Sequence, residues 1–278
     1  MTVKIVTDSC SDLPADIARA LGITVVPVYI CFGNKMYRDG VDISPEELYQ
    51  KLENANDCPT TTQPMPGDFS NVYQELAKEA DGIVSIHLPA RLSGTYNSAL
   101  QGRVFAKTKC DIEVIDALSV SMGLGLIVMA AAKVAQAEGN LRQVIHETKK
   151  LIPKIHVLGM MNSLKYLLAG GRISKTKATV ESRLRVKPLL ALKDGEVFQA
   201  ALVRSFAKGL EHQIEFVEKS GDVREVAIVY STAAEEAAVL KKRISYSVPE
   251  ERIYLARLGA ALGVHCGPGT IITAVRHA

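Results

Sequence analysis

Hydroxyl side chains gather in three short segments of the chain. The segments are TDSCSD at 7–12, PTTTQP at 59–64 and PARLSGT at 89–95. Hydroxyls and the free N–H groups of a helix N-terminus can bind an anion together, and Gly94 would let a ligand approach the backbone closely. Each hydroxyl alone could equally cap a helix or close a turn. Their recurrence favours an anion site formed by Thr7, Ser9, Thr61, Thr62, Ser93 and Thr95.

Phosphate is one candidate anion, but the nucleotide-binding motifs are incomplete. The segment LSGT at 92–95 lacks the Gly-x-x-x-x-Gly-Lys pattern of a phosphate-binding loop. The segment GLGLIV at 123–128 has two of the three glycines of a dinucleotide fingerprint. Small residues are also what a buried helix needs at that place, so neither segment indicates a nucleotide.

A hydrolase is the alternative that these residues leave open. Asp8, Ser93 and His265 would serve as orienting acid, nucleophile and base of a Ser-dependent lipid or ester hydrolase. The Gly-x-Ser-x-Gly pattern of a nucleophile elbow is missing. Ser93 is preceded by Ala90-Arg91-Leu92 and followed by Gly94-Thr95, so neither glycine of the pattern is in place.

The spacing of cysteines and histidines and the distribution of charge argue against a metal site and against nucleic-acid binding. The five cysteines form no C-x-x-C pair and the six histidines no H-x-x-x-H spacing, so we expect reduced thiols and no metal site. Residues 154–187 hold eight Lys or Arg against Glu181 alone, in a chain of net charge +3. This stretch is either a solvated face or a surface for an anionic partner. It has no aromatic residues interleaved with its cations and no zinc-finger or RNA-recognition signature, so we do not expect nucleic-acid binding.

The N-terminus and the apolar segments predict a cytoplasmic protein. Residues 1–10 read as a strand rather than a secretory signal. The most apolar window, residues 123–132, is shorter than the ~20 residues that span a bilayer, and we expect it to be a buried helix.

The elements that must position these residues alternate along the first half of the chain. We expect strands at 3–6, 23–32, 81–88 and 112–116, and helices at 15–21, 44–52, 93–107 and 124–137. Ser44 and Glu47 form the capping box of the second of these helices. The segment 61–80 is expected to be a polar loop followed by another helix. The alternation predicts a mainly parallel, Rossmann-like sheet with both faces covered, and segment 59–64 as a loop.

The pattern changes near Pro153. Residues 185–192 and 197–203 read as two strands joined at the Asp194-Gly195 turn. Further strands are expected at 225–231, 252–259 and 269–277, with a helix starting at Thr232 and capped through Glu235. We therefore predict an α/β protein of two domains, 1–153 with the parallel sheet and 154–278 with a mixed or antiparallel sheet.

The chain resembles the DegV family over nearly its whole length. The resemblance rests on six segments, which are TDSCSDLP at 7–14, TTTQP at 60–64, LSGTYNSA at 92–99, LKYLLAGGRIS at 164–174, KPLLALKDG at 187–195 and GVHCGPG at 263–269. It implies a two-domain DegV-like fold with the ligand between the domains. It also implies a non-catalytic lipid-binding protein, the fatty-acid-binding subunit of a bacterial fatty acid kinase.

The resemblance further implies the ligand and its site. A long-chain fatty acid such as palmitate would have its carboxylate held by Thr61 and Ser93, beside His265 in the VHCGPG turn, with Thr62 and Gly94 as neighbours. The protein would need no cofactor and would present the acid to a separate ATP-binding kinase subunit, which makes the acyl phosphate. Contact with a membrane surface would be at most transient.

The resemblance assigns a partner surface and also shows departures from the family pattern. Arg172 matches the kinase-facing position, and the cations that could extend this footprint are Lys175, Lys177, Arg183 and Arg185. Thr62 stands where serine is usual, Pro89 and Ala90 replace serines before LSGT, and Cys266 replaces a small polar residue. These departures bear on the hydrogen bonding of the head group and leave Thr61, Ser93 and His265 in place.

Overall fold

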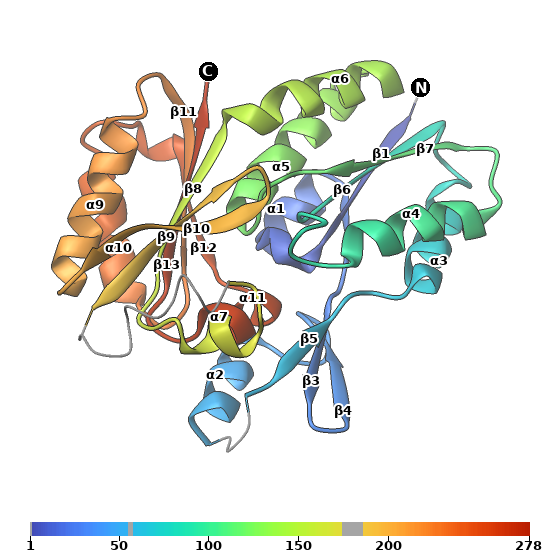
Figure 1. Ribbon diagram of the computed structural model, residues 1–278. Helices are drawn as coiled ribbons and strands as arrows, with labels where there is room; N and C mark the ends of the chain where they lie inside the picture. The colour runs from blue at the N-terminus through green and yellow to red at the C-terminus, as the bar shows by residue number, and fades with distance from the viewer. Residues whose placement is uncertain (1, 55–57, 174–185) are drawn as a thin grey trace.

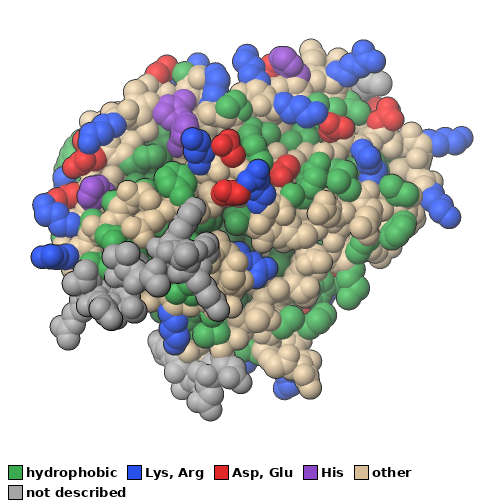
Figure 2. Space-filling view, in the orientation of Figure 1, with side chains coloured by type: hydrophobic (Ala, Val, Ile, Leu, Met, Phe, Trp, Pro, Cys, Tyr) green, Lys and Arg blue, Asp and Glu red, His purple; other side chains and the backbone are tan. Residues whose placement is uncertain are grey.

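Two large sheets, with helices packed against them, form the framework of the molecule (Figure 1). The computed structural model describes residues 2–54, 58–173 and 186–278. One sheet is parallel with four strands and the other is mixed with six, so the predicted α/β fold class is confirmed. Figure 2 shows acidic and basic side chains interspersed over the face that it presents.

The parallel sheet has the strand order β2 (Ile23–Val26), β1 (Val3–Asp8), β6 (Gly82–His87) and β7 (Asp111–Asp116). Successive side chains of a strand point to opposite faces, and both faces are covered here. One face packs on α5 (Met122–Gln136) and α6 (Leu141–Leu151), and the other on α3 (Pro66–Leu76) and α4 (Thr95–Ala106). Because all four strands are parallel, the loops after β1 and β6 leave the same edge of the sheet.

The predicted strand at 23–32 divides at Pro27, which has no N–H to extend the ladder with β1. The chain then forms β3 (Tyr29–Phe32), which pairs with β4 (Lys35–Arg38) and with β5 (Thr60–Thr62) in a small antiparallel sheet. The expectation of a loop at 59–64 was therefore wrong for its central residues. Between these strands lies α2 (Pro45–Asn54), where Ser44 and Glu47 form the predicted capping box.

The mixed sheet has the order β10 (Glu196–Val203), β9 (Lys187–Lys193), β8 (Ile155–Met160), β13 (Ile271–His277), β11 (Val223–Tyr230) and β12 (Ile253–Arg257). The β9–β10 hairpin is confirmed: Asp194 and Gly195 have φ of +51° and +75°, as a tight two-residue turn requires. Our expectations did not include β8, α6 or α9 (Phe206–Glu218).

The start of α10 (Ala234–Ile244) differs from the prediction. The residue before this helix is Ala233, and no side chain caps it. The hydroxyl of Thr232 instead accepts a hydrogen bond from the backbone N–H of Gly269, 2.9 Å away. A partner distant in the sequence has taken the hydroxyl that the local pattern assigned to the helix.

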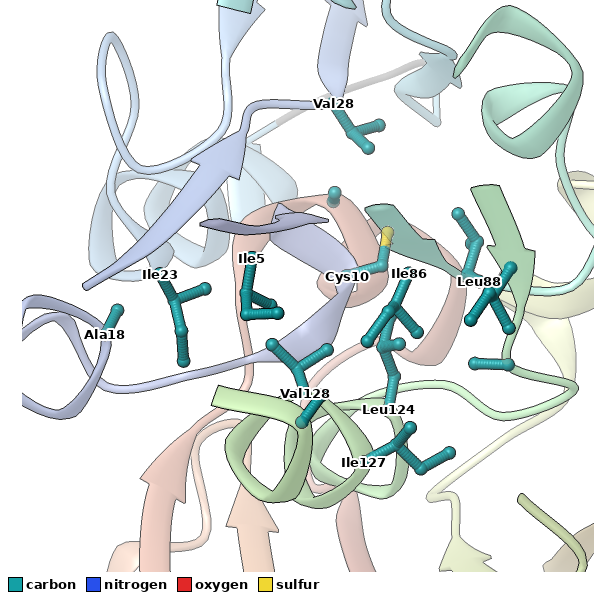
Figure 3. Packing of buried hydrophobic residues seen from close by; sticks show 14 of the residues in the cluster. Ile5, Cys10, Ala18, Ile23, Val28, Ile86, Leu88, Leu124, Ile127 and Val128 are labelled. Atoms are coloured by element: carbon teal, nitrogen blue, oxygen red, sulfur yellow. The ribbon is translucent and has the colours of Figure 1, made fainter. Parts of the chain in front are cut away.

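Helix α5 is the buried helix expected at 123–132, and it packs against both large sheets. Leu124, Ile127 and Val128 pack with residues of β1 and β6 such as Ile5 and Ile86 (Figure 3). The opposite side of the helix packs on the mixed sheet through Met122, Leu126 and Met129. In the described ranges, no helix is long and apolar enough to cross a bilayer.

The segment VHCGPG at 264–269 was expected to be a turn, but its first three residues belong to a helix. This helix, α11 (Ala260–Cys266), contacts α2, α7 (Lys165–Ala169) and β5. Its last turn carries His265, and Gly267 ends it with φ of +73°. The helix therefore brings a histidine from near the C-terminus to the small sheet of the N-terminal half.

Candidate functional site

A largely apolar pocket lies between the mixed sheet and the loops that leave the parallel sheet. It holds about 830 Å³ of space free of protein atoms, counted out to its mouth. The apolar lining from the mixed sheet comprises Val157, Gly159, Leu190, Leu192, Val197 and Ile272. The loops and α11 add, among others, Leu88, Leu92, Val120, Ala261 and Leu262. A mainly apolar wall with a few polar groups is typical of small-molecule sites.

Thr61 and His265 meet at this pocket although they are 204 positions apart in the sequence. The hydroxyl oxygen of Thr61 lies 2.7 Å from Nε2 of His265. Pairing of Thr61 with Ile30 on β3 fixes the direction of the threonine, while the last turn of α11 fixes the histidine. The pair forms a polar site in an otherwise apolar wall.

The imidazole of His265 is uncharged at neutral pH. Burial, followed by the positive charge of Arg172, lowers the pKa of His265 to about 4. The ring packs closely on Gly170, where a Cβ atom would lie 2.3 Å from Nδ1. Nδ1 is buried and has no hydrogen-bond partner among the described residues. Nδ1 therefore retains unused hydrogen-bonding capacity on the side of the ring that packs on Gly170.

Ser93 lines the same pocket on a tight turn. The carbonyl of Pro89 accepts hydrogen bonds from the N–H groups of Leu92 and Ser93, at 2.9 and 3.1 Å. The Ser93 hydroxyl lies 2.9 Å from that of Thr95 and also accepts the Thr95 N–H. Ala90 contributes its N–H to Asp116. The turn is thus well held without the serines that Pro89 and Ala90 replace.

Gly94 and Thr62 are not part of the pocket lining. Gly94 precedes α4 and faces the side chain of Gln63, whose Cδ would lie 3.0 Å from a Cβ at this position. Thr62 follows Thr61 on the extended strand β5, so its side chain points to the opposite face. Each of the two residues directly follows, in the chain, a residue that lines the polar end of the pocket.

The broader expectation of six clustered hydroxyls was wrong, because only Thr61 and Ser93 line the pocket. Thr7 is fully buried and donates to the carbonyl of Ile86, 2.8 Å away. Ser9 accepts the N–H of Val28 at 3.0 Å. These hydroxyls hold the loops at the edge of the parallel sheet.

Arg172 lies at the pocket, where the sequence had suggested only a partner surface. Its side chain is partly buried and donates to the carbonyl of Gly170 and, through Nε, to that of Leu92 at 3.4 Å. It therefore joins the segment next to His265 to the turn that carries Ser93. The cations proposed to extend its footprint, Lys175, Lys177, Arg183 and Arg185, lie outside the described residues.

The geometry does not assemble the hydrolase triad. Asp8 accepts a hydrogen bond from Nδ1 of His87 at 2.9 Å and from the N–H of Leu88 at 3.1 Å. His265 is bonded to Thr61, and Ser93 to Thr95. The carboxylate, imidazole and hydroxyl are thus engaged in three separate sets of contacts. The described part of the chain also brings no three His, Cys, Asp or Glu side chains together as a metal site.

Comparisons with known proteins agree on one family. Residues 2–276 match the family model described as "Uncharacterised protein, DegV family". A DegV domain-containing protein of Caldanaerobacter subterraneus is 35% identical over 96% of this chain and 95% of its own length. The structure of a DegV family protein from Thermus thermophilus, described by its fatty acid binding, is 32% identical, covers both chains fully and has a TM-score of 0.92. Bacillus subtilis DegV, described as a fatty acid binding protein, is 26% identical with full coverage of both chains and a TM-score of 0.89.

Proposed function

The chain belongs to the DegV family, and we propose that it binds one long-chain fatty acid with the acyl chain in the apolar pocket and the carboxylate at Thr61, Ser93 and His265. The observation that carries this proposal is the composition of the pocket, which is apolar along the mixed sheet and has its hydroxyls, imidazole and guanidinium from other segments. Such a lining suits a molecule with one long apolar part and one polar end.

The energetics of the two ends are complementary. Each buried methylene gains ~0.8 kcal/mol, so ~14 methylenes gain up to ~11 kcal/mol before the costs of association. The carboxylate is an acceptor only, and it needs donors. The hydroxyls of Thr61 and Ser93 can donate, and Arg172 supplies positive charge in the same pocket. In this proposal the backbone of Thr62 and of Gly94 lies next to the head group, while their side-chain positions do not line the pocket.

The direct test is to identify what the protein carries. Purified protein is extracted with organic solvent and the extract is analysed by mass spectrometry, which reports ligand class, chain length and unsaturation together. We expect about one fatty acid per chain. The proposal would be contradicted if the purified protein carries no fatty acid and the delipidated protein does not bind hexadecanoate. Turnover of a fatty ester that is lost in both Ser93→Ala and His265→Ala would support the hydrolase instead.

We further propose that the protein is a carrier without catalytic activity of its own, which presents the carboxylate to a separate ATP-binding kinase subunit. In this proposal the chain divides into domains 1–153 and 154–278, with the ligand between them. In this proposal the hydroxyls of Thr61 and Ser93 donate to the carboxylate, while the single N–H of neutral His265 donates to the Thr61 hydroxyl and orients it.

Reconstitution with a fatty acid kinase tests the carrier role. Acyl phosphate should form only when the kinase, ATP and lipid-loaded protein are all present. Arg172→Ala separates two roles of this residue. Retained hexadecanoate affinity with lost phosphorylation would support a kinase contact, whereas equal loss of both would restrict Arg172 to the head-group end of the pocket.

A further inference from the structure

The N-terminus of α11 is held by two buried carboxyl groups from the opposite end of the chain, Asp12 and Asp39. Asp12 Oδ1 accepts the N–H of Gly259 at 2.8 Å, and Asp39 Oδ1 accepts that of Ala260 at 3.0 Å. Gly259 leaves room for both, since a Cβ there would lie 2.9 Å from Asp12 Oδ1 and 3.4 Å from Asp39 Oδ2. The first free N–H groups of the helix are thus satisfied by side chains rather than by water.

Asp12 is itself fixed in place. Its other oxygen is hydrogen-bonded by the hydroxyl of Ser121, and the N–H of Ser121 donates to the carbonyl of Cys10 at 2.8 Å. Asp12 and Ser121 both have a positive φ, +50° and +55°, and Asp12 lies in the left-handed region. Non-glycine residues keep such conformations only where their surroundings enforce them. The anchor is therefore a preformed part of the fold.

Helix α11 transmits this anchoring to the pocket. It is seven residues long, about 10 Å from end to end, and His265 is in its last turn. A sideways shift is blocked at Gly263, where a Cβ would lie 2.7 Å from Leu48 and 2.8 Å from the hydroxyl of Tyr49. Because the sides of the helix are packed, its remaining movements are translation along its axis and rotation around it. The N-terminal hydrogen bonds restrain these two movements.

We infer that Asp12 and Asp39 are positioning residues for the ligand head group, because they hold α11 at the depth and rotation that bring His265 to Thr61. The inference rests on the proposed fatty-acid site. Neither carboxylate lines the pocket, so neither is expected to touch the ligand. Their effect on binding must pass through the helix.

The first test measures hexadecanoate affinity by titration calorimetry on delipidated, full-length protein at a temperature where every variant is folded. Asp39→Ala should bind roughly tenfold more weakly, the size expected for loss of a helix cap. Asp39→Asn should restore affinity, because its amide oxygen still accepts the Ala260 N–H. Asn140→Ala is the matched control: it removes the cap of α6, which carries no pocket residue, and should bind as the wild type does.

Unchanged affinity in folded Asp39→Ala, or an equal loss in Asn140→Ala, would overturn the inference. If Asp39→Ala does not fold, Gly259→Ala takes its place. The φ of Gly259 is −60°, which alanine adopts readily, while its Cβ would push both carboxylates away. This variant should show the same weakening, and wild-type affinity in it would count against the positioning role.

The second test needs no ligand. The ring nitrogen signals of His265, followed by NMR in ligand-free protein, report its hydrogen bond to Thr61. They should change in Asp39→Ala and Gly259→Ala and stay in place in Asp39→Asn and Asn140→Ala. If the wild type binds no fatty acid but these signals still move, the proposed function fails and the positioning role stands. If the wild type binds and the signals do not move, only the positioning role fails.

Discussion

At the scale of single residues, the pairing of Thr61 with His265 gives the pocket its chemical character. An uncharged imidazole and a hydroxyl share a short hydrogen bond beside an apolar wall. Ser93 lines the same pocket from another loop. Loss of any one of these groups should weaken ligand binding without disrupting the packing of the hydrophobic core, because none of them is a large apolar side chain.

We predict that Thr61→Val and Ser93→Ala each weaken hexadecanoate binding by roughly 1–3 kcal/mol, the value of a hydrogen bond to a charged group. Thr60→Val is the matched control, since Thr60 is an exposed residue of the same strand. Calorimetric titration of delipidated protein measures all three. Wild-type affinity in both pocket variants would remove these hydroxyls from the head-group site.

The buried His265 also predicts a pH dependence of stability. Its pKa is lowered from 6.5 to about 4 in the folded protein, so the unfolded chain binds more protons between these values. The stability contribution of the neutral ring is complete above pH 6.5 and is lost as pH falls towards 4, by up to about 3 kcal/mol.

Denaturant unfolding between pH 4 and 7 checks this pH dependence. His265→Gln should flatten the decline in unfolding free energy, while the control His212→Gln, at an exposed position, should leave it as in the wild type. A wild-type profile in His265→Gln would mean that other groups cause the acid sensitivity.

At the scale of elements, α5 is the layer that the two large sheets share. Its small residues allow this double packing. A Cβ at Gly123 would lie 2.4 Å from the hydroxyl of Ser119 and 2.5 Å from Cγ2 of Val157 on β8. Val157 also lines the pocket, so the packing of α5 and the shape of the pocket are linked.

We therefore expect Gly123→Ala to destabilise the protein by about 1–3 kcal/mol through overpacking, despite the better helix propensity of alanine. Gly67→Ala in α3 is the control, because a Cβ there has open space. Urea unfolding measures both free energies. A stabilised Gly123→Ala variant would show that the contact between α5 and β8 yields easily.

At the scale of the whole molecule, the pocket takes its walls from both halves of the chain. A bound acyl chain would therefore contact residues from both halves of the chain at once. Its removal should destabilise the whole fold. Delipidated protein is expected to unfold at a lower temperature. Hexadecanoate at a free concentration of 100 times its dissociation constant should restore about 2.7 kcal/mol.

Scanning calorimetry at fixed protein concentration checks this stabilisation. Acetate is the control ligand, because it has the carboxylate without the chain and should not raise the unfolding temperature. Equal unfolding temperatures with and without hexadecanoate would contradict preferential binding to the folded state.

The sequence by itself determined the fold class and several elements. Period and composition located the strands of the parallel sheet, the buried helix at 123–132 and the β9–β10 hairpin at Asp194-Gly195. These features depend on side-chain patterning and turn geometry within a few residues, which a sequence records directly. The six matching segments likewise indicated the family.

Only the tertiary structure decided which of the suggested residues share the pocket. It turned Thr61 towards His265 and Thr62 away, placed Arg172 at the pocket, and engaged Asp8 with His87 rather than with His265. These outcomes depend on strand register and on packing between segments far apart in the chain. Local patterns specify which face of an element is buried, but the partner that covers it is set by the folded chain as a whole.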